Sequence, residues 1–178
     1  MENKPILIIL SDLWGKDQSD WISHYIKNLQ SNFKITYYNC CELGKLDKTD
    51  STEQSLHEQF VNGGIERAVN NLILTEKQKV NILAFSIGGT IAWKACLLGL
   101  KAQNIFAVSS TRLRLEIDKP LVNIELYYGE KDQFQPGIHW FEKMNIERQI
   151  LPNEDHNFYQ KSAFSEKLSQ RIIDKLIR

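Results

Sequence analysis

The sequence predicts a three-layer α/β fold, in which a mostly parallel sheet of about six strands is covered by helices on both faces. The main observation is that short, β-rich apolar runs alternate with longer segments of helical periodicity. A length of 178 residues suits one domain of ordinary size. Because no internal repeat, low-complexity segment or Pro/Gly/Ser-rich linker interrupts the chain, we expect residues 1–178 to form a single domain.

Six apolar runs are predicted to be the strands of this sheet. In chain order they are Pro5–Leu10, Phe33–Tyr38, Val80–Phe85, Asn104–Ser109, Leu121–Tyr128 and Ile146–Leu151. Right-handed crossovers between them give a mostly parallel sheet. Ligands bind at the carboxyl ends of the strands in such sheets, so functional residues are expected directly after each strand.

The remaining apolar residues recur at helical spacing and predict the covering helices. These segments are Ser19–Gln30, Thr52–Leu74, Ile87–Leu100, Gly137–Met144 and Ala163–Ile177. Gly63 and Gly64 lie in the middle of the second segment, where we expect them to split or kink the helix.

Charge and hydropathy exclude several classes of partner. The 22 Lys and Arg residues balance 22 Asp and Glu residues, without a dense basic block, which argues against binding to nucleic acid. The longest apolar run, Ile6–Leu10, is far shorter than the roughly 20 residues of a membrane-spanning helix. The N-terminal residues lack the features of a secretory signal, so we expect a cytoplasmic protein.

The cysteines and histidines predict neither a disulfide framework nor a metal centre. Three cysteines contain no CxxC pair, and four scattered histidines lack metal-ligand spacing. We therefore expect no metal and no cofactor. Cys40 and Cys41 follow a predicted strand and could border a site, but without a cationic neighbour we interpret them as structural.

A candidate nucleophile follows the third predicted strand. Ser86 stands between that strand and a helix that begins at once, with the small residues Ala84 and Gly88 two positions to either side. This pattern favours a tight turn that exposes the serine hydroxyl. The amide of Ile87 would point from the helix N-terminus toward developing negative charge. The alternative is that Gly88 and Gly89 only permit close packing of helix on strand.

A carboxylate and a histidine follow the next strand ends. Asp132 lies in the turn after the fifth strand, and His156 lies in the loop after the sixth. Glu130 and Asp155 compete for the role of the acid; we favour Asp132, because Asp155 adjoins the histidine and Glu130 comes earlier in the turn. The alternative for His156 is an exposed loop residue without a role.

In this order, with each residue after a separate strand, the serine, the acid and the histidine resemble the catalytic residues of the α/β-hydrolase family. The resemblance extends over nearly the whole chain. The resemblance implies that Ser86 is a nucleophile whose proton is taken by His156, and that Asp132 orients the imidazole. The segment after the first strand, Ser11–Gly15, resembles the family's His-Gly-x-x-Gly segment. It implies that the Leu13 amide is an oxyanion donor together with the amide of Ile87.

Two features of this first loop leave alternatives open. Asp12 could repel an oxyanion, cap the following helix or hydrogen-bond Ser11. Trp14 could form a pocket wall or pack in the core. We expect Trp14 and Phe134 to form the apolar wall of a substrate site.

The connection Thr111–Pro120 is too short for an inserted cap. The sequence therefore predicts a lidless serine hydrolase that cleaves a carboxylic ester or thioester of a small substrate through an acyl-enzyme. A catalytically weak or inactive binding protein with the same fold is the alternative. A nucleotide or flavin binder is disfavoured, because no glycine-rich phosphate-binding motif follows a strand.

Overall fold

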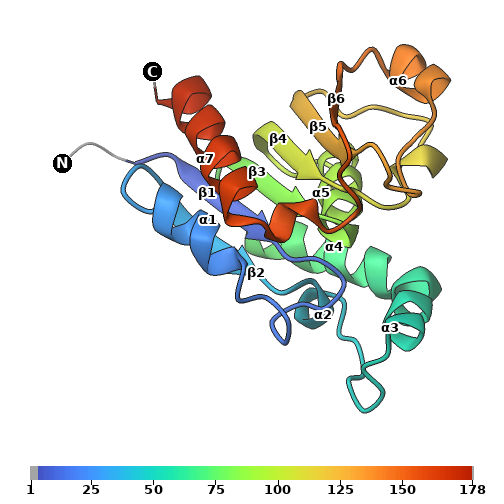
Figure 1. The fold of residues 1–178 in the computed structure, drawn as a ribbon. Helices are drawn as coiled ribbons and strands as arrows, with labels where there is room; N and C mark the ends of the chain where they lie inside the picture. Colours follow the sequence, from blue (N-terminus) through green and yellow to red (C-terminus); the bar gives the residue numbers. More distant parts are fainter. Residues whose placement is uncertain (1–3, 178) are drawn as a thin grey trace.

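The computed structural model describes residues 4–177 and contains a six-stranded sheet in which every neighbouring pair of strands is parallel. The strands lie in the order β2-β1-β3-β4-β5-β6 (Figure 1). Their bounds are β1 (Ile6–Leu10), β2 (Lys34–Tyr38), β3 (Val80–Phe85), β4 (Ala102–Val108), β5 (Asn123–Gly129) and β6 (Arg148–Leu151). The predicted α/β fold with a parallel sheet is confirmed.

The strand order reverses direction between β1 and β3. From β1 the chain passes outward to β2 at one edge, then returns to β3 on the other side of β1 and continues to β6 at the far edge. Ile8 lies opposite Thr36 of β2 and Ile82 of β3. Where the order reverses, the loops after neighbouring strands diverge and leave a crevice at the carboxyl ends. Here that crevice lies between the loops after β1 and β3.

Helices cover both faces of the sheet (Figure 1). They are α1 (Ile22–Leu29), α2 (Cys40–Leu43), α3 (Glu53–Gln59), α4 (Ile65–Thr75), α5 (Ile87–Leu97), α6 (Ile138–Met144) and α7 (Ser162–Leu176). Side chains alternate between the faces along each strand. Leu7 and Ile9 of β1 pack with α1 and α7, whereas Ile8 and Leu10 pack with α4 and α5. The two buried clusters thus fix the register of the central strand.

The predicted helix Thr52–Leu74 is divided, as its two glycines suggested. Thr52 caps α3 by accepting a hydrogen bond from the Ser55 amide. Between α3 and α4 the backbone leaves helical geometry at Asn62 and at Gly63, whose φ is 100°. The kink places α3 away from the sheet, beyond the carboxyl ends of the strands (Figure 1).

The short helix α2 was not predicted. Its four residues are too few for helical periodicity, and it depends on Asn39, whose side-chain oxygen accepts a hydrogen bond from the Cys41 amide. The connection between β4 and β5 contains a single 3-10 turn, η2 (Leu113–Leu115), among the residues that the structure describes.

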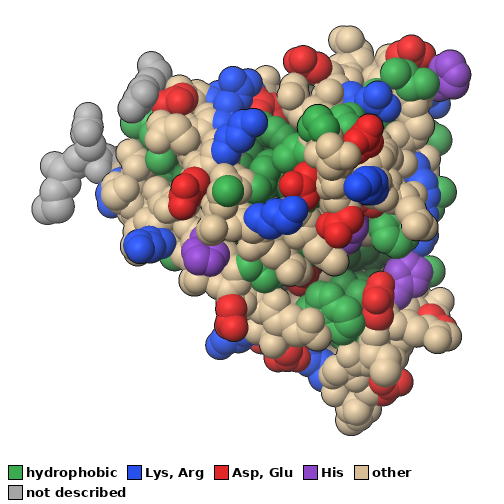
Figure 2. All heavy atoms as spheres, in the orientation of Figure 1, with side chains coloured by type: hydrophobic (Ala, Val, Ile, Leu, Met, Phe, Trp, Pro, Cys, Tyr) green, Lys and Arg blue, Asp and Glu red, His purple; other side chains and the backbone are tan. Residues whose placement is uncertain are grey.

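On the face in Figure 2, basic and acidic side chains are interspersed and no extended basic area is seen. Within residues 4–177, none of the helices combines the length and the apolar character needed to cross a membrane.

Candidate active site

Ser86 occupies a strained turn between β3 and α5. Its φ of 49° and ψ of −118° lie outside the regions that non-glycine residues favour, and such conformations cluster at functional sites. Neighbouring strands and loops hold the turn in place: the Ser86 amide donates to the Val108 carbonyl, and its carbonyl accepts from the amides of Gly89 and Thr111. The backbone around the serine is therefore fixed before any ligand binds.

The two glycines after the serine are required by close backbone packing. A Cβ atom on Gly88 would lie 2.4 Å from the carbonyl oxygen of Ser11, and one on Gly89 would lie 1.7 Å from the hydroxyl of Ser110. The close packing that the sequence offered as an alternative explanation is thus real. The packing and the strained serine occur together, because the same glycines bring the start of α5, directly after Ser86, against the loops after β1 and β4.

The structure brings together Ser86, His156 and Asp132, three residues that are far apart in the sequence. His156 Nε2 lies 3.2 Å from Ser86 Oγ, and His156 Nδ1 lies 2.9 Å from Asp132 Oδ2. The Asp132 side chain is fully buried, whereas 21% of the His156 side chain is exposed. Asp132 also accepts a hydrogen bond from the Phe134 amide through its other oxygen. This arrangement allows a proton to pass from the hydroxyl to an imidazole held in one orientation.

The two competing carboxylates point elsewhere. Glu130 accepts a hydrogen bond from the Asn153 amide, and exposed Asp155 accepts one from the Asn157 amide. Neither is hydrogen-bonded to His156 in the part of the chain that the structure describes.

Ser109, which the sequence analysis did not single out, holds the histidine loop. Its hydroxyl donates a hydrogen bond of 2.7 Å to the carbonyl of His156. Gly129 allows the same loop to pass closely, because a Cβ atom there would lie 2.4 Å from the Asp155 carbonyl oxygen. The signal for Ser109 was its place at the carboxyl end of the predicted strand Asn104–Ser109, where functional side chains meet; in the structure β4 ends one residue earlier, at Val108.

Two residues that line the cavity with Ser86 have backbone amides without a protein partner in the described chain. Among the described residues, neither the Leu13 amide nor the Ile87 amide donates a hydrogen bond to another protein group. Ile87 is the first residue of α5, so its amide belongs to the positive end of the helix dipole. Leu13 and Ile87 both line the cavity that contains Ser86. Their free amides are suited to binding a developing negative charge.

Asp12 is buried and lines the same cavity as Leu13 and Ile87. Its hydrogen-bond partners show which of the roles considered for it applies. Its carboxylate accepts hydrogen bonds from the Trp14 amide at 3.0 Å and the Tyr159 hydroxyl at 3.1 Å. It caps no helix, and Ser11 donates to its backbone carbonyl rather than to its carboxylate. Burial raises the pKa of Asp12 to about 6, although these hydrogen bonds oppose the shift. The carboxylate thus fixes the conformation of the loop that presents Leu13.

Cys40 and Cys41 anchor the same loop from α2. The Cys40 thiol donates to the Ser11 carbonyl and the Cys41 thiol to the Leu13 carbonyl, both at 3.1 Å. Burial raises the pKa of the Cys41 thiol to about 11. Both cysteines therefore act here as neutral hydrogen-bond donors, in keeping with their structural interpretation.

A cavity of about 260 Å³ contains this constellation. Trp14 forms part of its wall and also packs against the buried cluster, so both roles considered for it apply. Phe134 is 40% exposed and lies edge-on to the His156 ring, with 5.2 Å between ring centroids. The sequence analysis missed five further lining residues with charged or titratable side chains: Glu53, His57, Arg112, Arg114 and Tyr159.

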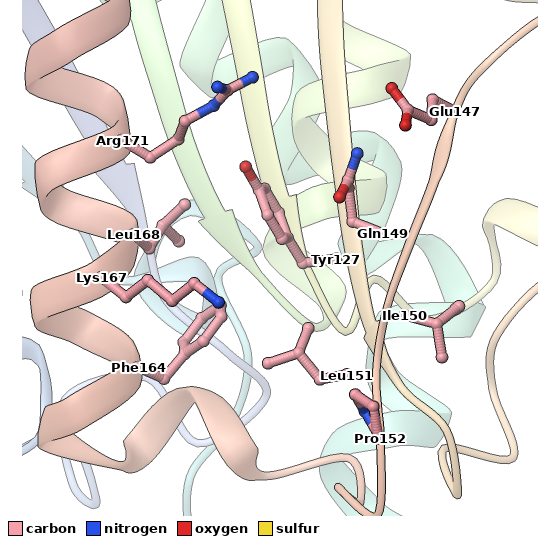
Figure 3. Close-up of a pocket in the computed structure, with 10 residues that line it drawn as sticks. All are labelled: Tyr127, Glu147, Gln149, Ile150, Leu151, Pro152, Phe164, Lys167, Leu168 and Arg171. Carbon is pink, nitrogen blue, oxygen red and sulfur yellow. The ribbon is translucent and has the colours of Figure 1, made fainter.

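A second cavity, of about 460 Å³, lies away from the serine between β5, β6 and α7 (Figure 3). Tyr127 and Leu168 point into it, and Arg171 lines one end. The Arg171 guanidinium is hydrogen-bonded to Glu125 at 3.1 and 3.4 Å.

Throughout residues 4–177, no group of three or more His, Cys, Asp or Glu side chains is arranged to hold a metal ion.

Comparison of the sequence with protein families and with curated proteins gave no match. The structure, in contrast, is similar to several solved structures. A protein of Xanthomonas campestris pv. campestris assigned to the alpha/beta hydrolase superfamily is 14% identical, with a TM-score of 0.70 over 97% of this chain and 100% of that one.

Two further structures share the architecture. Est1E of Butyrivibrio proteoclasticus is 10% identical, with a TM-score of 0.67 over 100% of this chain and 90% of its own. An α/β serine hydrolase without a lid from Xanthomonas campestris is 11% identical, with a TM-score of 0.60 over 98% of this chain and 85% of its own. The chain therefore has the α/β-hydrolase fold.

Proposed function

We propose that the protein is a serine hydrolase that cleaves a carboxylic ester or thioester of a small substrate through an acyl-enzyme. The observation that carries the proposal is the continuous contact from Ser86 Oγ through the His156 imidazole to the buried Asp132 carboxylate, at 3.2 and 2.9 Å. The fold supports it, since the similar structures include proteins described as hydrolases.

In the proposed reaction, His156 Nε2 takes the Ser86 proton as Oγ forms a bond to the substrate carbonyl carbon. The carbonyl oxygen becomes an oxyanion, which accepts hydrogen bonds from the amides of Leu13 and Ile87. Asp132 keeps His156 Nδ1 protonated and stabilises the imidazolium. The intermediate then expels the alcohol or thiol, which receives the proton from His156.

The second half of the reaction regenerates the serine. Water gives a proton to His156 and attacks the acyl carbon, and the resulting intermediate releases the carboxylic acid as Ser86 recovers its proton. Trp14 and Phe134 would form the apolar wall against the substrate. Each step uses groups of the chain itself and a water molecule.

A ligand-binding protein that retains the fold without turnover is the second candidate function. The observation that favours it is that Asp12 lines the same cavity as Ser86, Leu13 and Ile87, because an ionised acid there opposes an oxyanion.

The two candidates differ in turnover of a simple ester. The test compares hydrolysis of 4-nitrophenyl acetate and of a short acyl thioester by the wild type and Ser86→Ala. Ser110→Ala is the matched control, because the Ser110 hydroxyl is buried without a hydrogen-bond partner in the described chain. We expect Ser86→Ala to lose at least about 10³-fold in kcat and Ser110→Ala to retain activity. Equal turnover by all three proteins would contradict the proposal, and absence of turnover would favour the binding protein.

A further inference from the structure

The cavity at Ser86 has a cationic wall that the hydrolytic steps do not use. Arg112 and Arg114, both in the connection between β4 and β5, line the cavity together with Ser86. The Thr111 amide donates to the Ser86 carbonyl at 3.4 Å, and the Thr90 hydroxyl donates to the Thr111 carbonyl. Arg112 is the next residue along the chain, so its backbone is fixed close to the turn that presents the serine.

The Arg112 guanidinium is without a partner. Arg112 as a whole residue is half-buried, and its guanidinium forms no hydrogen bond or ion pair in the part of the chain that the structure describes. Its backbone has a φ of 64°, a left-handed conformation that is uncommon for a non-glycine residue. Arg171, which lines the other cavity, is instead paired with Glu125. An unpaired guanidinium on a residue that lines a cavity has N–H donors to offer to an anion.

Arg114 is exposed at the rim of the cavity and lies against Phe134. Its guanidinium carbon is 5.9 Å from the centroid of the Phe134 ring, which in turn lies against the His156 ring. One of its nitrogens also donates to the Phe134 carbonyl at 3.4 Å. These contacts hold the cation near the reacting groups and leave its other N–H groups available.

The acidic side chains around the cavity do not neutralise this wall. Asp12 directs its carboxylate at the Trp14 amide and the Tyr159 hydroxyl. Glu53 is exposed on α3 together with His57, and within residues 4–177 it forms no ion pair with either arginine. The positive charge therefore stays available to a ligand in the cavity.

We propose that the cavity takes an ester that also carries a carboxylate, and that Arg112, assisted by Arg114, binds this carboxylate. The proposal rests on the proposed hydrolase function, because it assigns the substrate class of the same site. The planar guanidinium matches a carboxylate with two parallel hydrogen bonds, which gives orientation as well as attraction. The carboxylate would then fix the ester carbonyl relative to Ser86.

The kinetic test uses matched pairs of esters. One pair is 4-acetoxybenzoate and its methyl ester, with the carboxylate on the leaving group; the other is the 4-nitrophenyl half-ester of adipic acid and 4-nitrophenyl hexanoate, with the carboxylate on the acyl group. In at least one pair we expect the carboxylate to raise kcat/KM about tenfold or more. Arg112→Gln should reduce that ratio to about 1, and Arg112→Lys should give an intermediate value. The control is Arg148→Gln, which removes the same charge from an exposed position of β6 and should leave the ratio unchanged.

A binding measurement separates this proposal from the hydrolase assignment. Titration calorimetry of Ser86→Ala with the same esters should show tighter binding of the carboxylate member of the preferred pair, and adding Arg112→Gln should abolish the difference. Equal binding of both members of each pair would overturn the carboxylate site. If neutral esters are cleaved with dependence on Ser86 but no carboxylate is preferred, the hydrolase stands and this proposal fails. If no ester is cleaved but the carboxylate still binds through Arg112, the hydrolase fails and the carboxylate site stands.

Discussion

The electrostatic environment of Asp12 can be tested by measuring how the free energy of unfolding depends on pH with and without its carboxylate. The residue is 1% exposed and lines the same cavity as Leu13 and Ile87, and burial raises its pKa from 3.8 to about 6. The change to asparagine keeps the shape and removes the charge. An asparagine oxygen can still accept from the Trp14 amide, and its amide group can donate to the Tyr159 oxygen.

The sign and size of the effect follow from proton linkage. Because its pKa is raised, the folded protein binds the Asp12 proton more tightly than the unfolded chain does. The resulting stabilisation is fully present below the unfolded value, near pH 4, and is lost as the pH rises to the folded value, near pH 6. At about 1.4 kcal/mol per pKa unit, the loss amounts to about 3 kcal/mol.

Urea unfolding at several pH values from 4 to 7, followed by tryptophan fluorescence, measures the contribution of Asp12 to the free energy of unfolding. The free energy of unfolding of the wild type minus that of Asp12→Asn should fall by about 2–3 kcal/mol over this range, since other titrating groups cancel in the difference. Asp20→Asn, which changes an exposed carboxylate, serves as the control and should give a constant difference. A constant or rising difference for Asp12→Asn would refute the reasoning.

Three further predictions concern the serine turn, the acid and the cavity. Gly88→Ala should lower the free energy of unfolding by about 1–3 kcal/mol and reduce esterase activity, because the new Cβ meets the Ser11 carbonyl. The free energy is measured by chemical denaturation, and an unchanged value would contradict this prediction. Asp132→Asn should reduce kcat on the order of 10⁴-fold because it disturbs the tautomer of His156, whereas Asp155→Asn should have little effect; the reverse ranking in steady-state assays would exchange the acid assignment. Across 4-nitrophenyl esters of increasing chain length, acetate and butyrate should have higher kcat/KM than long-chain esters, because the cavity of about 260 Å³ buries little of a long chain; values that rise steadily with length would show a deep acyl tunnel.

The sequence was sufficient to predict the sheet and the three residues that meet at its carboxyl edge. Strand runs such as Val80–Phe85 are fully buried and too short for a typical helix, so their length and apolar character together predict a strand. Ser86, Asp132 and His156 could be identified because each directly follows a strand, and parallel strands bring their carboxyl ends together.

Other parts of the site depend on tertiary contacts that leave no pattern in the sequence. The cationic wall at Arg112 arises because the backbone after β4 is pinned to the serine turn, which the spacing of residues does not reveal. The kink at Gly63 was expected, but the direction in which it sends α3, with Glu53 at the cavity, follows only from packing. The role of Asp12 likewise required knowing that Tyr159 lies against it.

The central claim is that Ser86 is a nucleophile activated by its surroundings, and covalent labelling tests it most directly. A fluorophosphonate probe should lose fluoride and form one phosphonyl adduct per chain on Ser86 Oγ, found by intact mass and located by peptide mass spectrometry. Ser86→Ala should form no adduct, and Ser110→Ala should be labelled like the wild type. An unlabelled wild type, or equal labelling of Ser86→Ala, would contradict the assignment of this site.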